Sequence, residues 1–186
     1  NAYYLLFFGN IKKVLELEEV RYYLGIILFS IVVISCNIYS MCQGLFDTIT
    51  KSSFQVASII TTAGFTTTDF DLWPKTSQII LVMLMFVGAC AGSTGGGIKV
   101  SRFVILFKTI FKEFNSYIHP HSVKKIKMDG KSIEHDVIRS VNVHMITFIA
   151  LFAISVFIIS FENLDLTTTF TAVATTINNV GPGLEL

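Results

Sequence analysis

The stretch that decides the fold is Gly88-Ala89-Cys90-Ala91-Gly92-Ser93-Thr94-Gly95-Gly96-Gly97-Ile98-Lys99. It lies within Thr76–Phe111, an apolar segment that is longer than one straight membrane span needs. Because each glycine costs a helix interior about 1 kcal/mol relative to alanine, we expect the helix to unwind here. Irregular backbone at membrane depth is tolerated only where protein buries it or where it lines water. The alternative is a close contact between helices through small residues, but three consecutive glycines exceed what such a contact needs.

The same block does not fit a phosphate-binding loop. That motif places Lys directly after its second Gly and then Ser or Thr, whereas here Ile98 precedes Lys99 and Val100 follows it. A lysine at the bilayer centre would cost about 2.5–3.5 kcal/mol. We therefore expect Lys99 to face water, either in a pore or at the cytoplasmic surface.

Long runs without Asp, Glu, Lys or Arg define candidate membrane spans at Tyr22–Cys42, Thr76–Ile98 and Ser140–Phe161. Each is long enough for a spanning helix, which needs about 20 apolar residues. Lys and Arg gather before the first run and between the second and third, while only Lys51 and Lys75 lie between the first two. By the positive-inside rule, the basic segments are cytoplasmic and residues 51–75 lie on the opposite side of the membrane.

The composition agrees with a membrane protein and excludes several other classes. Of the 186 residues, 52% are hydrophobic and 15% are charged, whereas soluble domains contain about 25% charged residues. The 17 Phe and 3 Pro are unlike a disordered chain, and a net charge of +1 does not favour nucleic acid as a partner. Cys36, Cys42 and Cys90 cannot form a paired disulfide framework, so we expect small side chains buried in the membrane. The chain begins at Asn1 without Met or a signal-peptide pattern, and we interpret it as a fragment.

The sequence repeats at an offset of 117 residues. Ala57–Gly64 aligns with Ala174–Gly181, and both are Ser/Thr-rich apolar segments that end in glycine. Each follows a long apolar run and an acidic residue, Asp47 or Asp165. We expect a unit of span, short helix, glycine strand and second span, which is complete in the first copy, while the second stops after its glycine.

The short helices predicted at 47–61 and 165–177 cannot cross the membrane. A helix of about 14 residues rises only some 20 Å, against about 30 Å of hydrocarbon. They must therefore enter and return, with the acidic residues at their positive ends. Their negative ends would face Thr62–Phe65 and Asn179–Pro182, where they attract cations. The alternative, interfacial loops that pack the bundle, is less consistent with the repeat.

Neither glycine strand has an acidic residue at its centre, so a bound cation must be held by backbone carbonyls, with Thr or Asn oxygens assisting. Turning successive carbonyls toward one axis requires a positive φ, which glycine adopts at the lowest cost. Gly64 and Gly181 occupy matching positions in the two copies. Downstream of the first, Asp69–Pro74 is either a vestibule that concentrates cations or a turn with Trp73 anchored at the membrane interface. Apart from its net acidity, we favour the turn.

These motifs resemble the Trk/Ktr/HKT superfamily of cation transporters, and within it the bacterial TrkH potassium-uptake subunits. The resemblance is carried by Gly88–Lys99, Thr61-Thr62-Ala63-Gly64-Phe65 and Asn178-Asn179-Val180-Gly181-Pro182-Gly183. It implies an all-α membrane protein in which repeated units of span, re-entrant pore helix, filter and span surround a pseudo-fourfold pore. This chain would hold the third of four repeats and the fourth repeat through its filter.

The resemblance also implies the roles of individual residues. Potassium would be the permeant ligand, with no organic cofactor, bound by the backbone carbonyls of Thr62, Ala63, Gly64, Asn179, Val180 and Gly181. The glycine block would be a gate within the membrane, formed by Gly92, Ser93, Thr94, Gly95, Gly96, Gly97 and Lys99. The basic residue that faces this loop in the family belongs to the last span, which is absent from this sequence.

We divide the chain accordingly. Residues 1–21 are the end of the preceding repeat and a cytoplasmic link. Residues 22–114 are a complete pore repeat, with a span at 22–42, a pore helix at 47–61, a filter at 62–66 and a broken span at 76–111. Residues 115–135 are a second cytoplasmic link. Residues 136–186 are a partial repeat, with a span at 140–161, a pore helix at 165–177 and a filter at 178–183.

The link at 115–135 alternates polar and apolar residues around Asp129-Gly130, which is typical of a two-residue β-hairpin. It could dock a cytosolic regulator or touch anionic lipid headgroups. The resemblance implies a nucleotide-binding regulatory subunit of the TrkA type, a homodimer, and a multi-pass location in the bacterial cytoplasmic membrane. We interpret His119 and His121 as loop residues rather than metal ligands, and we expect His144 to hydrogen-bond within the bundle.

The function that we expect is potassium uptake through a carbonyl filter gated by the glycine block. A sodium-conducting or poorly selective transporter of the same superfamily is the alternative, and the first-repeat filter that bears on this choice is not in the sequence. A membrane-embedded enzyme is not favoured, because the spans contain no paired carboxylates. A purely structural subunit would not require matched filter glycines.

Overall fold

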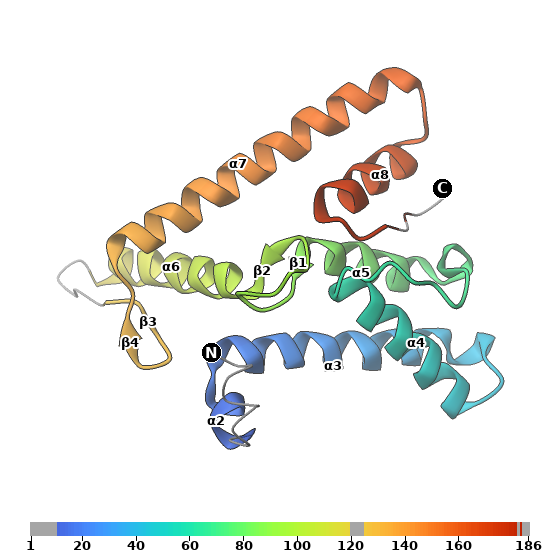
Figure 1. The fold of residues 1–186 in the computed structure, drawn as a ribbon, viewed down its shortest axis with the longest axis horizontal. Coiled ribbons are helices and arrows are strands. Elements are labelled where there is room, and N and C mark those ends of the chain that lie inside the picture. Colours follow the sequence, from blue (N-terminus) through green and yellow to red (C-terminus); the bar gives the residue numbers. More distant parts are fainter. Residues whose placement is uncertain (1–10, 120–124, 182, 184–186) are drawn as a thin grey trace.

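The computed structural model describes residues 11–119, 125–181 and 183, and most of them are helical (Figure 1). The helices are α2 (Ile11–Glu16), α3 (Glu18–Ile38), α4 (Leu45–Ile60), α5 (Lys75–Phe86), α6 (Val100–Ile118), α7 (His135–Ile159) and α8 (Leu166–Asn178). Three-residue 3₁₀ turns lie after α3, before α5 and after α7, and they are η1 (Tyr39–Met41), η2 (Phe70–Leu72) and η3 (Ser160–Glu162).

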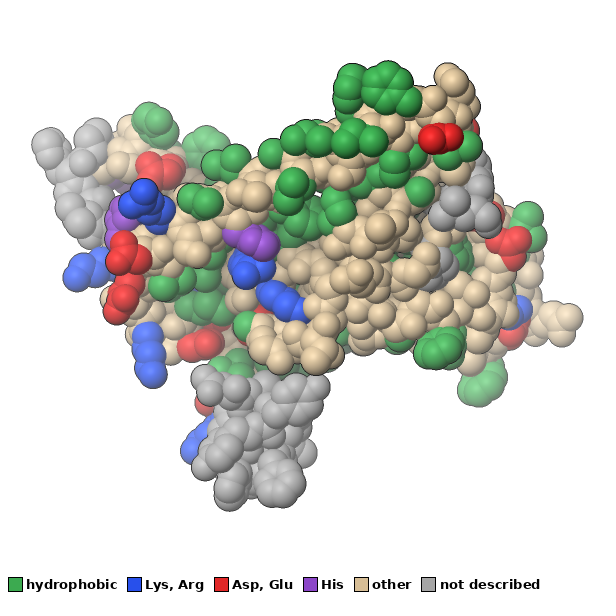
Figure 2. Space-filling view, turned by 45° about the horizontal axis from the view of Figure 1, so that its top comes forward, with side chains coloured by type: hydrophobic (Ala, Val, Ile, Leu, Met, Phe, Trp, Pro, Cys, Tyr) green, Lys and Arg blue, Asp and Glu red, His purple; other side chains and the backbone are tan. Residues whose placement is uncertain are grey.

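Two helices in the described part of the chain are long and apolar enough to cross a membrane. With the 3₁₀ turns that follow them, they cover Glu18–Met41 and His135–Glu162. Large hydrophobic side chains cover their outer faces, for example Phe29 on α3 (68% exposed) and Phe157 on α7 (66% exposed). Figure 2 shows such side chains along α7. Apolar faces of this extent are stable against lipid or further protein rather than against water.

Several helices have bounds that differ from those of the charge-free runs. α3 begins at Glu18 and ends at Ile38, where the sequence predicted 22–42; α7 begins at His135 rather than 140; and α6 continues to Ile118 rather than 111. Charged residues end a membrane-buried run, but a helix continues for as long as its backbone hydrogen bonds do. Residues 115–118 of the predicted link are therefore helical. Residues 1–10 of the predicted first segment lie outside the described residues.

The glycine block separates α5 from α6. Between these helices, β1 (Val87–Gly88) and β2 (Ile98–Lys99) pair in parallel, with Val87 opposite Ile98 and Gly88 opposite Lys99. Residues 89–97 thus form a loop that returns to its own start and is closed at its base by the strand pair. We refer to 89–97 as the glycine loop.

The main core joins α3, α4, α5 and α8. Its fully buried side chains include Ile34, Ile38, Val56, Ile59, Ile60, Leu81, Met85 and Ala174. Trp73 belongs to the same core and is only 8% exposed, so the expectation of a tryptophan at the membrane interface is wrong. The turn η2 folds this segment back onto the helices, and the large ring gains more by burial than by lying at an interface.

A smaller core lies between α6 and α7, where Ile105, Val141 and Met145 are buried and the hairpin packs against them. The hairpin pairs β3 (Lys127–Met128) with β4 (Lys131–Ser132) through Asp129 and Gly130. Both turn residues have positive φ (51° and 76°), as a type I′ turn requires.

Nearby, Arg102 Nη1 lies 2.9 Å from His144 Nε2, which confirms that His144 hydrogen-bonds within the bundle. His119 follows the end of α6, and His121 lies outside the described residues.

Candidate ion-binding site

The two short helices, α4 and α8, begin close to acidic residues. Asp165 is the N-cap of α8, and its carboxylate accepts a hydrogen bond from the N–H of Thr167 at 3.0 Å. This hydrogen bond lowers the pKa of the Asp165 carboxyl. In α4 the N-cap is Gly44, and Asp47 lies within the first turn, where it accepts from Lys51 Nζ at 2.7 Å. Both negative charges lie at the positive ends of their helices, although only Asp165 is a cap.

The opposite ends of α4 and α8 share one hydrogen-bonding pattern. In each, a residue in the left-handed region donates to the carbonyl three residues earlier, and the next residue donates to the carbonyl five residues earlier. The pairs are Thr62 to Ile59 (3.0 Å) and Ala63 to Ser58 (2.9 Å) in the first copy, and Asn179 to Thr176 (3.2 Å) and Val180 to Thr175 (2.9 Å) in the second. This is the Schellman motif. The sequence repeat is therefore also a repeat of backbone geometry.

Gly64 and Gly181 follow these motifs and lie against each other. Both have positive φ, 75° and 107°. A Cβ atom added to Gly181 would lie 3.5 Å from Gly64 Cα. One pocket of about 490 Å³ is lined by Thr62, Ala63, Gly64, Thr175, Thr176, Asn179, Val180 and Gly181. The structure thus brings the six residues that were predicted to bind potassium to a single pocket.

The backbone carbonyl oxygens of Thr62, Ala63, Gly64, Asn179, Val180 and Gly181 are the potassium ligands that the sequence predicted. None of them accepts a hydrogen bond from a donor within the described residues. By contrast, the carbonyl of Phe65 accepts from Ser58 Oγ at 2.6 Å, which ties the strand back to α4. The described part of the chain also contains no group of three His, Cys, Asp or Glu side chains that could hold a metal ion. Backbone oxygens are the ligands that this pocket offers to a cation.

The glycine loop packs against the ends of both short helices. The N–H of Gly96 donates to Thr62 Oγ1 at 3.2 Å. A Cβ atom at Gly96 would lie 1.8 Å from the carbonyl oxygen of Asn178, the last residue of α8. Only glycine allows so close an approach of two backbones. The predicted gate residues therefore lie directly beside the predicted filters.

Lys99 is half-buried at the base of the glycine loop. Its ammonium group donates hydrogen bonds to Ser93 O (3.1 Å), Ser93 Oγ (2.9 Å) and Gly95 O. These three hydrogen bonds use all of its donors. An irregular loop leaves carbonyls without partners, and Lys99 supplies donors to the glycine loop from its own base.

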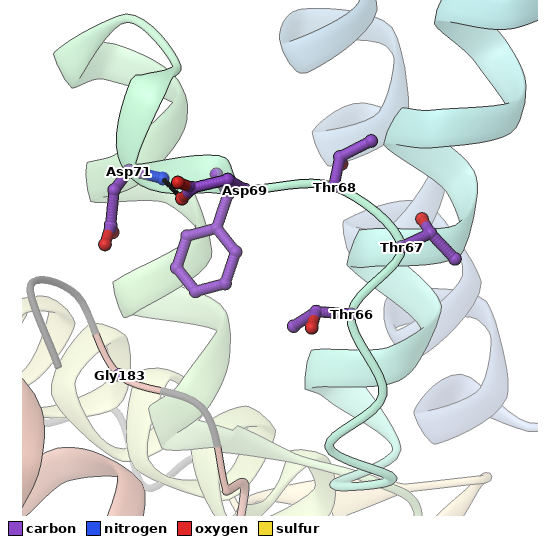
Figure 3. A pocket seen from close by; sticks show the side chains of 7 residues that line it. Thr66, Thr67, Thr68, Asp69, Asp71 and Gly183 are labelled. Atoms are coloured by element: carbon purple, nitrogen blue, oxygen red, sulfur yellow. Dashed lines mark hydrogen bonds between the residues drawn. The ribbon is translucent and has the colours of Figure 1, made fainter.

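A second pocket, of about 440 Å³, adjoins the filter segments (Figure 3), and its lining consists of Thr66, Thr67, Thr68, Asp69, Phe70, Asp71 and Gly183. The Asp69 carboxylate accepts from the N–H of Asp71 at 3.0 Å and caps η2. Figure 3 shows Gly183, from the second filter segment, across the pocket from the threonines. The acidic residues noted in the sequence therefore share a pocket with Thr66 and Gly183, the last residues of the two predicted filters.

Comparison with known proteins identifies the group to which this geometry belongs. Residues 20–185 match the family TrkH, described as a cation transport protein. The chain belongs to the TrkH family. This membership confirms the resemblance and the predicted fold class, an all-α membrane protein with repeated pore units.

Individual TrkH relatives match over most of this chain. The Trk system potassium uptake protein TrkH of Escherichia coli K12 is 36% identical over 170 residues, which are 89% of this chain and 35% of that protein. TrkG of the same organism is 33% identical over 177 residues, 94% of this chain and 36% of that protein. The crystal structure of the potassium transporter TrkH from Vibrio parahaemolyticus superposes with a TM-score of 0.83 at 34% identity, covering 89% of this chain and 36% of that one. The chain thus spans about a third of the length of these relatives.

Sequence reasoning missed two acidic residues that contact the glycine loop and the hairpin of this TrkH-family chain. Glu18 and Glu19 open α3, and both make hydrogen bonds to segments far away in the sequence. The signal was present in part: two adjacent acids precede an apolar run, in a segment where Lys and Arg are frequent. What they contact depends on the tertiary fold.

Proposed function

We propose that this chain contributes two filter segments to a potassium-uptake pathway across the bacterial cytoplasmic membrane. The observation that carries the proposal is the contact of Gly64 with Gly181 at two equivalent helix ends. The adjacent carbonyls accept no hydrogen bond within the described residues, so they are free to replace water around a cation. The relatives are named as potassium uptake proteins, which supports the choice of ion. Such a protein transports an ion and catalyses no covalent step.

The helix ends add a favourable field at this pocket. The C-terminal end of each short helix carries roughly half an elementary negative charge. Thr62 and Asn179 stand at these ends, and both line the pocket. A monovalent cation is therefore attracted without any carboxylate, and its binding stays weak enough for release.

The glycine loop, with Lys99, is the gate of this pathway. An ion that leaves the filters toward the cytoplasm meets Gly96, which touches the ends of both short helices. The loop can move only if the Gly96–Thr62 hydrogen bond breaks. The hydrogen bonds from Lys99 to Ser93 and Gly95 keep the loop compact in the closed arrangement.

The assembled transporter is a homodimer regulated by a cytosolic nucleotide-binding subunit of the TrkA type, and it binds no organic cofactor. The relatives are named as parts of a Trk system, which supports a multi-component assembly. The hairpin, with exposed Lys127 and Lys131, is the docking surface for the regulator. Figure 2 shows charged side chains gathered at this end of the molecule.

Rubidium uptake by the full-length protein in potassium-starved cells tests the filter assignment. Gly64→Ala and Gly181→Ala should each reduce uptake, or the preference for rubidium over competing sodium, about five- to thirtyfold, because a positive φ costs a residue with a Cβ about 1–2 kcal/mol. Gly25→Ala is the matched control, since Gly25 lies in α3 with open space around it. Normal uptake and selectivity in both filter variants would overturn the proposal. Equal uptake of sodium by the wild-type protein would favour the poorly selective alternative.

A further inference from the structure

The carboxylate of Glu19 joins the glycine loop to the start of α6. Its Oε1 atom accepts hydrogen bonds from the N–H of Ala91, in the loop, at 2.6 Å and from the N–H of Ser101, in the first turn of α6, at 3.3 Å. The residue at the N-cap of α6 is Lys99, which makes no capping hydrogen bond. The first N–H groups of a helix need an acceptor. Glu19 therefore caps α6 from another helix and holds the loop with the same oxygen.

The neighbouring residue, Glu18, is held by the cytoplasmic hairpin. Its N–H donates to Asp129 Oδ1, in the hairpin turn, at 2.8 Å. Its carboxylate pairs with Lys108 Nζ, which also donates to the carbonyl of Lys127 in β3 at 2.7 Å. The N-cap of α3, Leu17, has no side chain that can cap. Asp129 thus caps α3 from the hairpin, in the same way as Glu19 caps α6 from α3.

We propose that Glu18 and Glu19 couple the hairpin to the glycine loop, with Glu19 as the residue that positions the loop. The inference rests on the proposed function, because it assigns a route by which a cytosolic partner at the hairpin reaches the gate. Thr62, in the first proposed filter, and Lys99, at the base of the loop, also form hydrogen bonds with the loop. The Glu19 contact leads to the hairpin instead. Because Glu18 and Glu19 share the first turn of one helix, displacement of Asp129 or Lys108 disturbs both residues together.

The native Cys90, next to Ala91, reports on the loop directly. In the full-length protein with every other cysteine replaced by serine, the rate at which a water-soluble thiol reagent labels Cys90 measures how often the loop opens. Glu19→Ala should raise this rate about tenfold, since a hydrogen bond to a charged acceptor is worth roughly a factor of ten or more in an equilibrium. Glu19→Gln keeps an acceptor oxygen without the charge, so its labelling rate should lie between those of the parent protein and Glu19→Ala. Glu16→Ala, an exposed acid three residues before Glu19, is the matched control.

The glutamine variant separates positioning from charge. If Glu19→Gln labels as fast as Glu19→Ala, the lost negative charge acts on the thiol and the positioning role is wrong. If neither variant differs from Glu16→Ala, the loop is not held by Glu19 and the inference fails.

A double-mutant cycle tests the link to the hairpin. Lys108→Met removes the pair with Glu18 and should raise Cys90 labelling about threefold. In the double variant with Glu19→Ala, Lys108→Met should not raise the labelling rate further, because Glu19→Ala has already removed the hydrogen bond between α3 and the loop. If the two effects multiply instead, the hairpin and the loop respond independently, and the coupling is overturned.

Rubidium uptake in the same variants distinguishes this inference from the proposed function. Faster labelling together with higher basal uptake supports both. Faster labelling with unchanged uptake supports the coupling but contradicts the proposal that the loop is the gate. Unchanged labelling overturns the coupling, whatever the uptake.

Discussion

Gly96 shows how a single missing Cβ atom determines the packing of the glycine loop against the end of α8. Its neighbour is a backbone carbonyl, that of Asn178, and not the end of a flexible side chain. A backbone atom at a helix end cannot rotate away from an added Cβ atom, as the end of a flexible side chain can. The sequence marks this glycine only as one of three in a row, and the contact with α8 emerges from the fold.

Gly96→Ala should therefore displace the glycine loop from α8. A Cβ atom 1.8 Å from the Asn178 oxygen is impossible, and overpacking of this kind typically costs about 1–3 kcal/mol. The expected result is basal rubidium uptake raised severalfold, together with faster labelling of Cys90. Gly95→Ala, in the same loop, should have a smaller effect, because the nearest atom to its Cβ, Thr62 Oγ1, would lie at 3.3 Å. Equal behaviour of the two variants would contradict the assigned contact.

At the scale of helices and strands, the positions that sequence reasoning located well are those set by local chemistry. The short helices predicted at 47–61 and 165–177 are found at Leu45–Ile60 and Leu166–Asn178. Aspartate near the start and a left-handed bend before glycine at the end are local signals. The end of α6 and the start of α7 lie outside the predicted spans, because a charged residue ends an apolar run but does not end a helix. The partners of Lys99 and Glu19 could not be predicted, since they depend on where a loop and a distant helix meet.

The N-cap of α8 gives a pH-dependent prediction. The N–H of Thr167 lowers the pKa of Asp165 below its ordinary 3.8, so the ionised form is favoured in the folded protein. Its stabilising contribution is therefore fully present above pH 3.8 and is lost as the pH falls through the lowered value. Asp165→Ala should lower the thermal midpoint at neutral pH, and the difference from the parent protein should shrink below pH 3.8. Glu162→Ala, an exposed acid in η3, provides the control; a difference for Asp165→Ala that does not change with pH would exclude the charged cap.

At the scale of the whole molecule, the first pore unit is joined to the second by aromatic contacts. Phe86 at the end of α5, Phe152 on α7 and Phe170 on α8 form a cluster whose ring centroids lie 5.0–6.4 Å apart where they pair, with Phe148 at its edge. Figure 1 shows α8 between α7 and α5. Since α8 leads directly into Asn179–Gly181, this cluster sets where the second proposed filter lies relative to the first.

Phe152→Ala tests whether the aromatic cluster positions the second filter. Phe152 pairs with Phe86 at 5.3 Å and with Phe170 at 5.0 Å, and such pairs contribute about 0.5–1.5 kcal/mol each beyond the area they bury. The variant should lose about 1–3 kcal/mol of stability, less than a fully buried phenylalanine, because its ring is only partly covered. Because α8 would then pack less firmly on α5, the preference for rubidium over sodium should fall as well. Phe114→Ala, on the exposed face of α6, should change neither property. Lower stability with intact selectivity would show that Gly181 is held by its contact with Gly64 and not by the helices behind it.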